Sequence, residues 1–339
     1  MTSSVTGEGL LREGAVVETS GSTGRPKRVK LSGAAFRASA EAAAESLGEP
    51  GRWILTLPTH YVAGMNVLAR AAYWGIAPII ATGGPRFSAM GFAAVTPRTG
   101  EPLYVSLVPV QLQRLMDSVP GLDALRRVRR ILLGGQAPDP ALLRRARQEG
   151  LPVTVTYGSS ETCGGVLWDG VGIGDAEWRL VDGVVHLTGS SLADGYVLED
   201  GAPDAERDAE GFVEVDGRRW HRTKDFGEER SGRLLVLGRS DDMIVSGGIK
   251  VSLLEVQFAV RSRPGLDDAV AVAVDRPGWG QAPAIVTTGV ADLEELRAYV
   301  EANVGPAARP VSVTTVAEIP MLGSGKPDLR AIRALVARE

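Results

Sequence analysis

Short apolar runs alternate with helical patterns along the first half of the chain, between residues 16 and 158. The runs have the length and composition of buried strands and lie at residues 53–57, 78–81, 104–108, 131–133 and 153–156. Strands that alternate with helices are typical of βα units, in which a helix connects neighbouring strands of a parallel or mixed sheet. The pattern therefore predicts an α/β fold.

Two helices between these strands have clear boundary signals. Ser32 is a good N-cap for an alanine-rich helix that ends at Gly48. Pro140, directly after Asp139, favours the first turn of another helix, and Gly150 marks its end. Both helices alternate with predicted strands, as an α/β domain requires.

After Gly164 the pattern changes to short β-type runs separated by Asp-Gly pairs. The pairs stand at residues 182/183, 194/195, 200/201 and 216/217. Asp and Gly are common in tight turns because both tolerate left-handed backbone conformations. We expect a compact antiparallel β region that extends to about Gly238, within a large N-terminal domain of residues 1–240.

The C-terminal part mixes strand and helix patterns. Strands are expected from Met243 and at residues 269–274, 284–288 and 311–316, and helices at residues 253–263, 293–303 and 329–338. These elements suffice for a small α+β domain of roughly 100 residues with its own core. We assign residues 241–339 to this domain.

Composition limits what such a chain binds. The 339 residues carry 37 Lys and Arg against 41 Asp and Glu, a net charge of −4, so nothing favours broad binding of nucleic acid or anionic lipid. A small substrate is the better expectation. The single cysteine, Cys163, forms no internal disulfide, and three histidines give no zinc-type cluster with it.

No targeting or membrane segment is evident. The first residues lack the basic start and apolar run of a signal peptide, so we expect a cytoplasmic protein. The longest uncharged run, residues 53–69, contains Pro58, His60 and Gly64, and a buried strand, loop and helix explains it better than a membrane span.

A loop rich in hydroxyl groups follows the apolar pair Val16 and Val17. It comprises Thr19, Ser20, Gly21, Ser22, Thr23, Gly24, Arg25, Pro26 and Lys27. Glycines let backbone N–H groups approach a ligand, and hydroxyls with one lysine suit the β- and γ-phosphates of a nucleotide. A plain polar turn has a similar composition. The loop is not a Walker loop, because Lys27 follows proline and precedes Arg28.

A second segment of polar residues follows the predicted strand at residues 153–156. It comprises Tyr157, Gly158, Ser159, Ser160, Glu161 and Thr162. Ligands of α/β sheets bind beyond the carboxyl ends of strands, where Tyr157 could stack on a purine, Ser160 donate to a phosphate and Glu161 hold the Mg²⁺ of ATP. A strand-to-loop turn with a core tyrosine is the alternative.

Further candidates are spread along the chain. Gly135 and Gln136 lie in a loop that follows the predicted strand at residues 131–133, and the backbone of this loop could approach a base. Asp225 can accept two hydrogen bonds from a ribose diol, and Arg239 can donate to the same sugar or to a phosphate. Lys326 lies on a glycine-rich loop that could move it into a site as a point charge, although a helix-entry turn explains the same residues.

In order, these segments resemble the adenylate-forming superfamily of acyl-CoA synthetases and luciferases. The matching segments are the phosphate loop, residues 157–162, 223–225 and 238–250, and Lys326 with the glycine before it. The resemblance extends from residue 16 to the end of the chain. It implies a large N-terminal domain and a small mobile C-terminal domain that rotates about a hinge at Asp241.

Within the superfamily the chain is most similar to the o-succinylbenzoate–CoA ligases of menaquinone biosynthesis, in a compact form. The stretch from Leu57 to Arg70 resembles their acyl-pocket helix. It supplies His60, Asn66 and Arg70 as candidate partners for the second carboxylate of o-succinylbenzoate. A buried Arg70 paired with an acid of the protein would be equally ordinary.

The chain also departs from the pattern of the superfamily. Ser160 stands where Thr is common and keeps the hydroxyl, whereas Lys224 stands where Gly is common and adds a charge. His60 and Tyr61 reverse the usual order, in which an aromatic residue precedes His. Only 18 residues precede Thr19, so we expect part of the usual N-terminal subdomain to be absent, which could expose a surface that a homodimer covers.

The resemblance implies a two-step acid–thiol ligase. A carboxylate attacks the α-phosphorus of Mg·ATP, and the thiol of coenzyme A then captures the acyl group. Lys326 would bridge the acyl carboxylate and the α-phosphate, and Gly247, Gly248 and the neighbouring backbone would line the coenzyme A tunnel. Lys250 is a further cofactor-binding candidate. The alternatives are an aryl- or medium-chain acyl-CoA ligase and a non-catalytic nucleotide-binding relative. A serine hydrolase is disfavoured because no Gly-x-Ser-x-Gly motif occurs.

Overall fold

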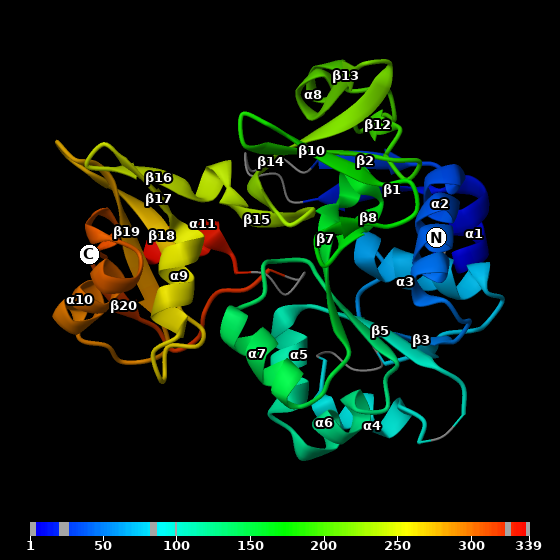
Figure 1. The fold of residues 1–339 in the computed structure, drawn as a ribbon, viewed down its shortest axis with the longest axis horizontal. Helices are drawn as coiled ribbons and strands as arrows, with labels where there is room; N and C mark the ends of the chain where they lie inside the picture. Colours follow the sequence, from blue (N-terminus) through cyan, green and yellow to red (C-terminus); the bar gives the residue numbers. More distant parts are fainter. Residues whose placement is uncertain (1–4, 20–26, 82–86, 99, 323–326, 337–339) are drawn as a thin grey trace. The chain divides into compact units, whose positions relative to one another are not determined.

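The computed structural model describes residues 5–19, 27–81, 87–98, 100–322 and 327–336 (Figure 1). The chain divides into two compact units. The N-terminal unit comprises residues 1–138, 142–223 and 229–235, and the C-terminal unit comprises residues 139–141, 224–228 and 236–339. The roles assigned to the two predicted domains, with ATP and acyl binding before residue 241 and the adenylation lysine after it, stay predictions.

The N-terminal unit contains a seven-stranded sheet. Its strand order is β4 (Ile79–Ile80), β3 (Arg52–Leu55), β5 (Leu103–Leu107), β6 (Arg130–Leu133), β7 (Val153–Ser159), β8 (Gly164–Trp168) and β9 (Val171–Gly172). Neighbours from β4 to β7 pair in parallel, whereas β8 and β9 are antiparallel additions at one side. The predicted mixed α/β sheet is confirmed, and the carboxyl ends of β5, β6 and β7 lie at one edge.

Among the described residues, seven α-helices come before β7 in the chain. They are α1 (Gly7–Glu13), α2 (Gly33–Leu47), α3 (Val62–Tyr73), α4 (Ala89–Val95), α5 (Pro109–Met116), α6 (Val119–Leu125) and α7 (Pro140–Gln148). Figure 1 shows α1, α2 and α3 side by side, and Leu10, Phe36 and Met65 join them in one buried core. A second core forms around Phe92 and Leu112 under α4, α5 and α6.

The predicted helix boundaries are confirmed where the sequence had strong signals. The Ser32 hydroxyl accepts a hydrogen bond from the Ala35 N–H at 3.2 Å, as an N-cap of α2 should. Gly48 ends α2 in the left-handed region, at φ 80°. The Asp139 carboxylate accepts from the Ala141 N–H at 2.7 Å in the first turn of α7.

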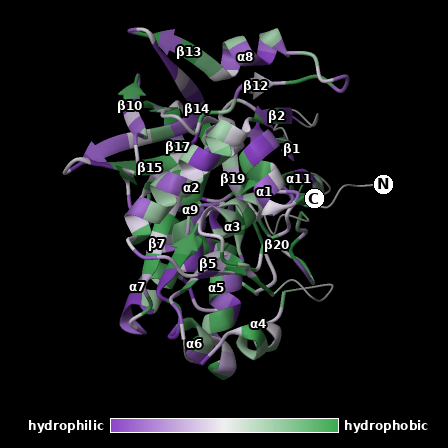
Figure 2. Ribbon diagram, turned by 90° about the vertical axis from the view of Figure 1, so that its right-hand side faces the viewer, coloured by the Kyte–Doolittle hydropathy of each residue, from purple (hydrophilic) through white to green (hydrophobic). Residues whose placement is uncertain are grey.

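The antiparallel region predicted from the Asp-Gly pairs is also confirmed. One sheet contains β1 (Ala15–Thr19), β2 (Lys27–Leu31) and β12 (Gly195–Tyr196), and the other contains β10 (Glu177–Val181), β11 (Val184–Thr188), β14 (Arg218–Arg230), β13 (Phe212–Val215) and β15 (Arg233–Arg239). Hydrophobic and hydrophilic residues are mixed along β13 and β14 (Figure 2), as expected for strands with one exposed face.

The turn residues explain two of these hairpins. Asp182 and Gly183 have φ values of 51° and 78°, and Asp216 and Gly217 have φ values of 54° and 72°. Two consecutive positive φ values are the mark of the type I′ turn, whose twist matches that of the strands. The Asp-Gly pair at 194/195 does not form such a turn, because Gly195 belongs to β12. Helix α8 (Ala205–Gly211), in the same region, was not predicted from the sequence.

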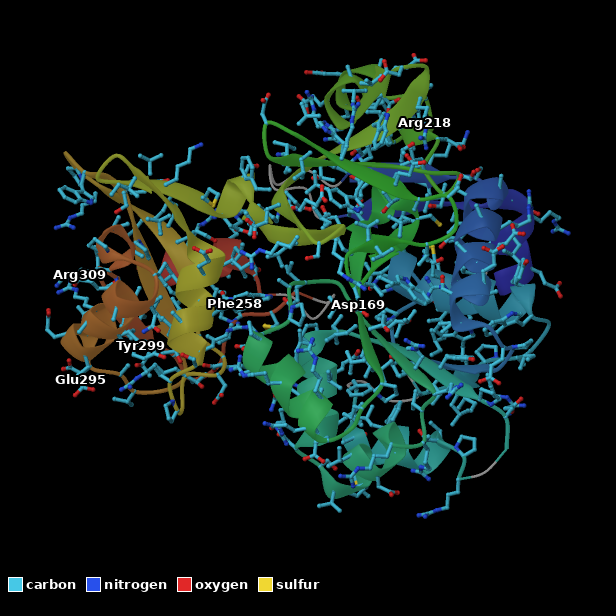
Figure 3. The ribbon with its side chains drawn as sticks, viewed as in Figure 1. Asp169, Arg218, Phe258, Glu295, Tyr299 and Arg309 are labelled. Carbon is cyan, nitrogen blue, oxygen red and sulfur yellow. The ribbon has the colours of Figure 1, made fainter. Side chains whose placement is uncertain are left out.

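The C-terminal unit has the predicted α+β composition. Its sheet has the order β17 (Ile249–Ser252), β16 (Met243–Ser246), β19 (Gly280–Thr287) and β18 (Val270–Arg276), with β20 (Val313–Thr315) parallel to β19. Its helices are α9 (Leu253–Arg261), α10 (Leu293–Asn303) and α11 (Leu329–Val336). Tyr299 of α10 (Figure 3) bonds to the Ser262 hydroxyl at the end of α9, with 2.8 Å between the oxygens.

In the described ranges, every helix falls short of the length and apolarity that a membrane-spanning helix needs.

Candidate functional site

Strand β7 changes its pairing partner just before the candidate site. Residues 153–155 pair in parallel with β6, and residues 156–159 pair antiparallel with β8, with a bulge between Tyr157 and Gly158. The sequence predicted the end of this strand at Thr156, but β8 supplies a partner for three more residues. A Cβ at Gly158 would lie 2.0 Å from the Gly164 carbonyl oxygen, so this close pairing requires glycine.

Glu161 lies in the short 3₁₀ turn η1 (Ser160–Thr162) that follows β7, and its side chain is buried. Its Oε1 accepts a hydrogen bond from the Tyr196 hydroxyl at 2.7 Å. Burial disfavours the charged carboxylate, but the nearby His221 and the hydrogen bond from Tyr196 outweigh burial, so the pKa of Glu161 lies below its ordinary value. The site therefore presents a carboxylate at neutral pH.

Hydrogen bonds hold the backbone of this turn from several sides. The Glu161 carbonyl accepts from the Ala193 N–H at 2.8 Å. The Thr162 hydroxyl accepts from the Ser159 N–H at 2.9 Å and donates to the Gly164 carbonyl at 2.8 Å. These bonds fix the direction in which the Glu161 side chain leaves the backbone.

The described ends of the predicted phosphate loop lie beside this turn. Thr19 and Lys27 are register partners in β1 and β2, and Lys27 Nζ lies 5.2 Å from the centroid of the Tyr196 ring. The structure thus brings Lys27, Tyr196 and Glu161 together from three distant parts of the sequence. Residues 20–26, which carry most of the predicted phosphate contacts, lie outside the described residues.

Tyr196 and His221 are two members of this cluster that sequence analysis missed. Tyr196 directly follows an Asp-Gly pair that was interpreted only as a turn. His221 is buried, and its Nδ1 lies 2.9 Å from the Gly211 carbonyl, to which it donates. Its position two residues before the segment 223–225, which resembles the superfamily, was the available signal.

Arg70 is a buried cation on α3, with 6% of its surface exposed. Its guanidinium lies over the Trp53 ring, 5.2 Å from the centroid. In the described part of the chain no carboxylate forms an ion pair with Arg70, and its Nε has no hydrogen-bond partner. Burial lowers the pKa of Arg70 to about 10, against a small opposing effect of Cys163. The sequence alternative of a buried Arg70 paired with an acid of the protein is not what the described residues show.

Asn66, one helical turn before Arg70, bonds to protein groups on three sides. Its Nδ2 donates to the Cys163 carbonyl at 2.8 Å and to the Val62 carbonyl at 3.1 Å, and its Oδ1 accepts from the Ser39 hydroxyl at 3.1 Å. Asn66 thereby connects α3 to the residue that follows η1. His60 is exposed and lies 4.2 Å from the Tyr61 ring, centroid to centroid. The substrate contacts assigned to Asn66 and His60 stay predictions.

The candidates of the C-terminal unit form their own contacts. The Asp225 carboxylate accepts from Arg239 Nη1 at 3.0 Å. Gly247 and Gly248 have φ values of 57° and 83°, and a Cβ at Gly247 would lie 2.6 Å from the ring of Trp279. This half-exposed indole, which sequence analysis did not single out, fixes the glycine turn from one side.

Four other predicted residues lie in a loop, on a strand or outside the described residues. Gly135 has a φ of 86° in the loop after β6, next to β7, and Gln136 follows it. Lys250 is exposed on β17. Lys326 lies outside the described residues.

The donor set around Glu161 fits a magnesium ion that arrives with a nucleotide. Over the described ranges, no group of three or more His, Cys, Asp or Glu side chains could hold a metal ion. Mg²⁺ is usually bound through one or two carboxylates together with the phosphates of its substrate. A single ionised carboxylate beside a predicted phosphate loop meets that requirement.

Comparisons with known proteins find similar sequences. A sequence model described as AMP-binding enzyme matches residues 16–196, and one described as AMP-binding enzyme C-terminal domain matches residues 255–326. A Mycobacterium tuberculosis protein named "Probable 2-succinylbenzoate–CoA ligase" is 35% identical over 327 residues, which cover 94% of this chain and 83% of that protein. The 2-succinylbenzoate–CoA ligase of Listeria monocytogenes is 28% identical and covers 94% of this chain and 69% of its own length.

A solved structure shows the same fold. The o-succinylbenzoate CoA synthetase of Bacillus subtilis, in complex with an acyl-adenylate intermediate, superimposes with a TM-score of 0.79. It is 24% identical, and the match covers 95% of this chain and 69% of that one. The elements that carry Lys27, Glu161 and Tyr196 all lie in the part of the chain matched by the AMP-binding enzyme model.

Proposed function

Because the chain belongs to the AMP-binding enzyme family, we propose that it is an acid–thiol ligase that converts o-succinylbenzoate to o-succinylbenzoyl-CoA. The names of its relatives support this reaction. The observation that carries the choice of substrate is Arg70, a buried cation without an acidic partner among the described residues. An isolated buried charge is costly, so a ligand with a second carboxylate is the natural partner.

The reaction has two steps. A carboxylate oxygen of the acid attacks the α-phosphorus of ATP, the bond from that phosphorus to the bridging oxygen breaks, and pyrophosphate leaves. The sulfur of coenzyme A then attacks the acyl carbon, the bond to AMP breaks, and the thiol proton is released. Transfers of this kind depend mainly on positioning and on neutralising charge.

The residues of the chain have separate roles in this scheme. Lys27 and the hydroxyls of residues 19–23 hold the departing pyrophosphate, and Glu161 holds Mg²⁺, which neutralises phosphate charge. Asp225 accepts hydrogen bonds from the ribose, and Tyr157 stacks on the base. Lys326 bridges the two reacting groups, and the backbone at residues 247–248 guides the thiol arm.

A pyrophosphate exchange assay tests the proposal. The protein is incubated with ATP, Mg²⁺ and labelled pyrophosphate, and o-succinylbenzoate is compared with benzoate and with a medium-chain fatty acid. We expect exchange with o-succinylbenzoate and little with the other acids, because only that acid offers a second carboxylate to Arg70. Preference for a fatty acid or for benzoate would reject the substrate. ATP binding without exchange for any acid would favour a non-catalytic nucleotide-binding relative.

A further inference from the structure

Tyr196 lies at the centre of the contacts around Glu161, although it is 35 residues away in the sequence. Its side chain is 2% exposed, and its hydroxyl donates to Glu161 Oε1 at 2.7 Å. A hydrogen bond from a neutral hydroxyl to a buried carboxylate is short and strong because the acceptor is charged. The bond therefore holds one oxygen of the carboxylate in a fixed direction.

The backbone of Tyr196 is fixed independently of this bond. Its N–H donates to Asp208 Oδ1 at 2.7 Å, and its carbonyl accepts from the Asp204 N–H at 2.9 Å. Gly195 has a φ of 154°, and a Cβ there would lie 2.7 Å from both carboxylate oxygens of Asp208. Glycine at position 195 thus makes room for the carboxylate that holds the tyrosine backbone.

The ring of Tyr196 is enclosed by its neighbours as tightly as its backbone is. A Cβ at Gly211 would lie 2.7 Å from Cε2 and 2.9 Å from the hydroxyl oxygen of Tyr196. Phe212 packs on the ring at 5.7 Å between centroids, and Lys27 Nζ lies 5.2 Å from its centroid. The hydroxyl therefore cannot leave Glu161 without a rearrangement of its neighbours.

We propose that Tyr196 is a positioning residue for Glu161. By holding Oε1, it would direct the remaining carboxylate oxygen to the Mg²⁺ that accompanies ATP, and its ring lies against Lys27, which would bind the phosphates of the same nucleotide. The inference rests on the role of Glu161 in the proposed function. Partners that orient a metal-binding side chain without touching the metal are worth roughly 10- to 100-fold in metal affinity.

The test uses Tyr196→Phe in the full-length protein, because this change removes one oxygen and keeps the ring. We expect the Mg²⁺ concentration that half-saturates pyrophosphate exchange to rise by about 10- to 100-fold. The maximal rate at saturating Mg²⁺ and the KM of the acid should change little. A titration of Mg²⁺ into protein with ATP and no acid, followed by calorimetry, measures the same loss without turnover.

Tyr104→Phe is a matched control. Tyr104 is 1% exposed, and its hydroxyl donates to the Glu49 carbonyl at 2.9 Å, away from Glu161 in the sequence and in the hydrogen-bond network. Loss of this hydroxyl should lower the melting temperature to a similar extent without changing the Mg²⁺ requirement. A double mutant adds a second check, because Tyr196→Phe should have no further effect on Mg²⁺ affinity in a Glu161→Gln protein.

Several outcomes would overturn the inference. An unchanged Mg²⁺ affinity in Tyr196→Phe, or an equal loss in Tyr104→Phe, would show that the hydroxyl does not position the metal site. A protein in which Tyr196→Phe raises the KM of the acid as much as the Mg²⁺ requirement would indicate a general loss of structure. Failure of the wild-type protein to bind Mg·ATP would reject both the inference and the proposed function. An unchanged Mg²⁺ affinity in Tyr196→Phe, or an equal loss in Tyr104→Phe, would reject the inference and leave the proposed function intact.

Discussion

Two buried side chains of opposite charge in the N-terminal unit, Glu161 and Arg70, differ in their interaction partners. Glu161 has a hydrogen bond from Tyr196 and a favourable field from His221. Arg70 has the face of Trp53 and, among the described residues, no anion. A buried charge with partners is tolerated, whereas an isolated one costs several kcal/mol in folding free energy. The difference suggests that the protein itself completes the site at Glu161, whereas the substrate completes the site at Arg70.

Asn66 connects the two regions. It lies on the same helix as Arg70, and it holds the carbonyl of Cys163, which follows the turn of Glu161. A shift of α3 on binding of the acid would therefore reach the turn through one hydrogen bond. The comparison between the two charges can be tested at each of these residues.

Glu161→Gln should have the largest effect, because it removes a charge whose surroundings are built for it. We expect pyrophosphate exchange to fall by ~10²–10³ with every acid tested. The fold should persist, since the amide oxygen still accepts from Tyr196. Exchange kinetics and a melting curve measure the two quantities. A loss restricted to o-succinylbenzoate would contradict the assignment of Glu161 to the nucleotide side.

Arg70→Met should have a smaller effect that depends on the acid. The KM for o-succinylbenzoate should rise by at least ~30-fold, which corresponds to about 2 kcal/mol. Residual exchange with benzoate should stay the same. The melting temperature of the empty protein should hold or rise, because an uncompensated buried charge is gone. A marked loss of stability without ligand would mean that the protein already supplies a partner for Arg70.

Asn66→Ala should weaken both regions moderately. The Cys163 carbonyl loses a donor, so the free energy of unfolding should fall by about 1–3 kcal/mol. The KM values for ATP and for the acid should both rise, by about 2- to 30-fold. Thr96→Val is a suitable control, because it removes a buried hydrogen bond of α4, at 2.7 Å from Thr96 Oγ1 to the Phe92 carbonyl. Altered KM values in the control would argue against a specific connection.

The smallest expected effect is the reaction of the Cys163 thiol, which lies between the regions of Glu161 and Arg70, with a thiol reagent. Burial raises the pKa of Cys163 to about 12, and Arg70 and the hydrogen-bonding groups of Asn66 and Ser39 only partly oppose it. The reactive thiolate is therefore scarce at pH 8, and the native protein should not react with a thiol reagent. One equivalent should react after unfolding in denaturant, since the chain has one cysteine. Rapid labelling of the native protein would show that this core opens.

Local signals in the sequence predicted what local chemistry controls. The cap at Ser32, the end of α2 at Gly48 and the hairpin turns at residues 182–183 and 216–217 depend on a few neighbouring residues, and all were predictable. The position of Glu161 after β7 was also predictable, because carboxyl ends of parallel strands gather at one edge.

The partners of Glu161 were not predictable in this way. Tyr196 lies beside Glu161 because β12 pairs with β2. The paired residues are about 170 positions apart in the sequence, so no local pattern could predict this pairing. The same holds for His221, which lies on β14. The lack of an acidic partner for Arg70 within the described ranges depends on what surrounds it in three dimensions, so the sequence could offer Arg70 only as one candidate among three.

Arg70, a buried cation without an anionic partner among the described residues, also has a consequence for the lifetime of the protein in a cell. A ligand that binds only the folded state stabilises it by about 2.7 kcal/mol at a concentration of 100 times its Kd. Proteases remove chains in proportion to the fraction that is transiently unfolded. Copies of this protein that lack the acid would then be degraded faster than copies that hold it, so the supply of substrate would help to set how much enzyme the cell keeps.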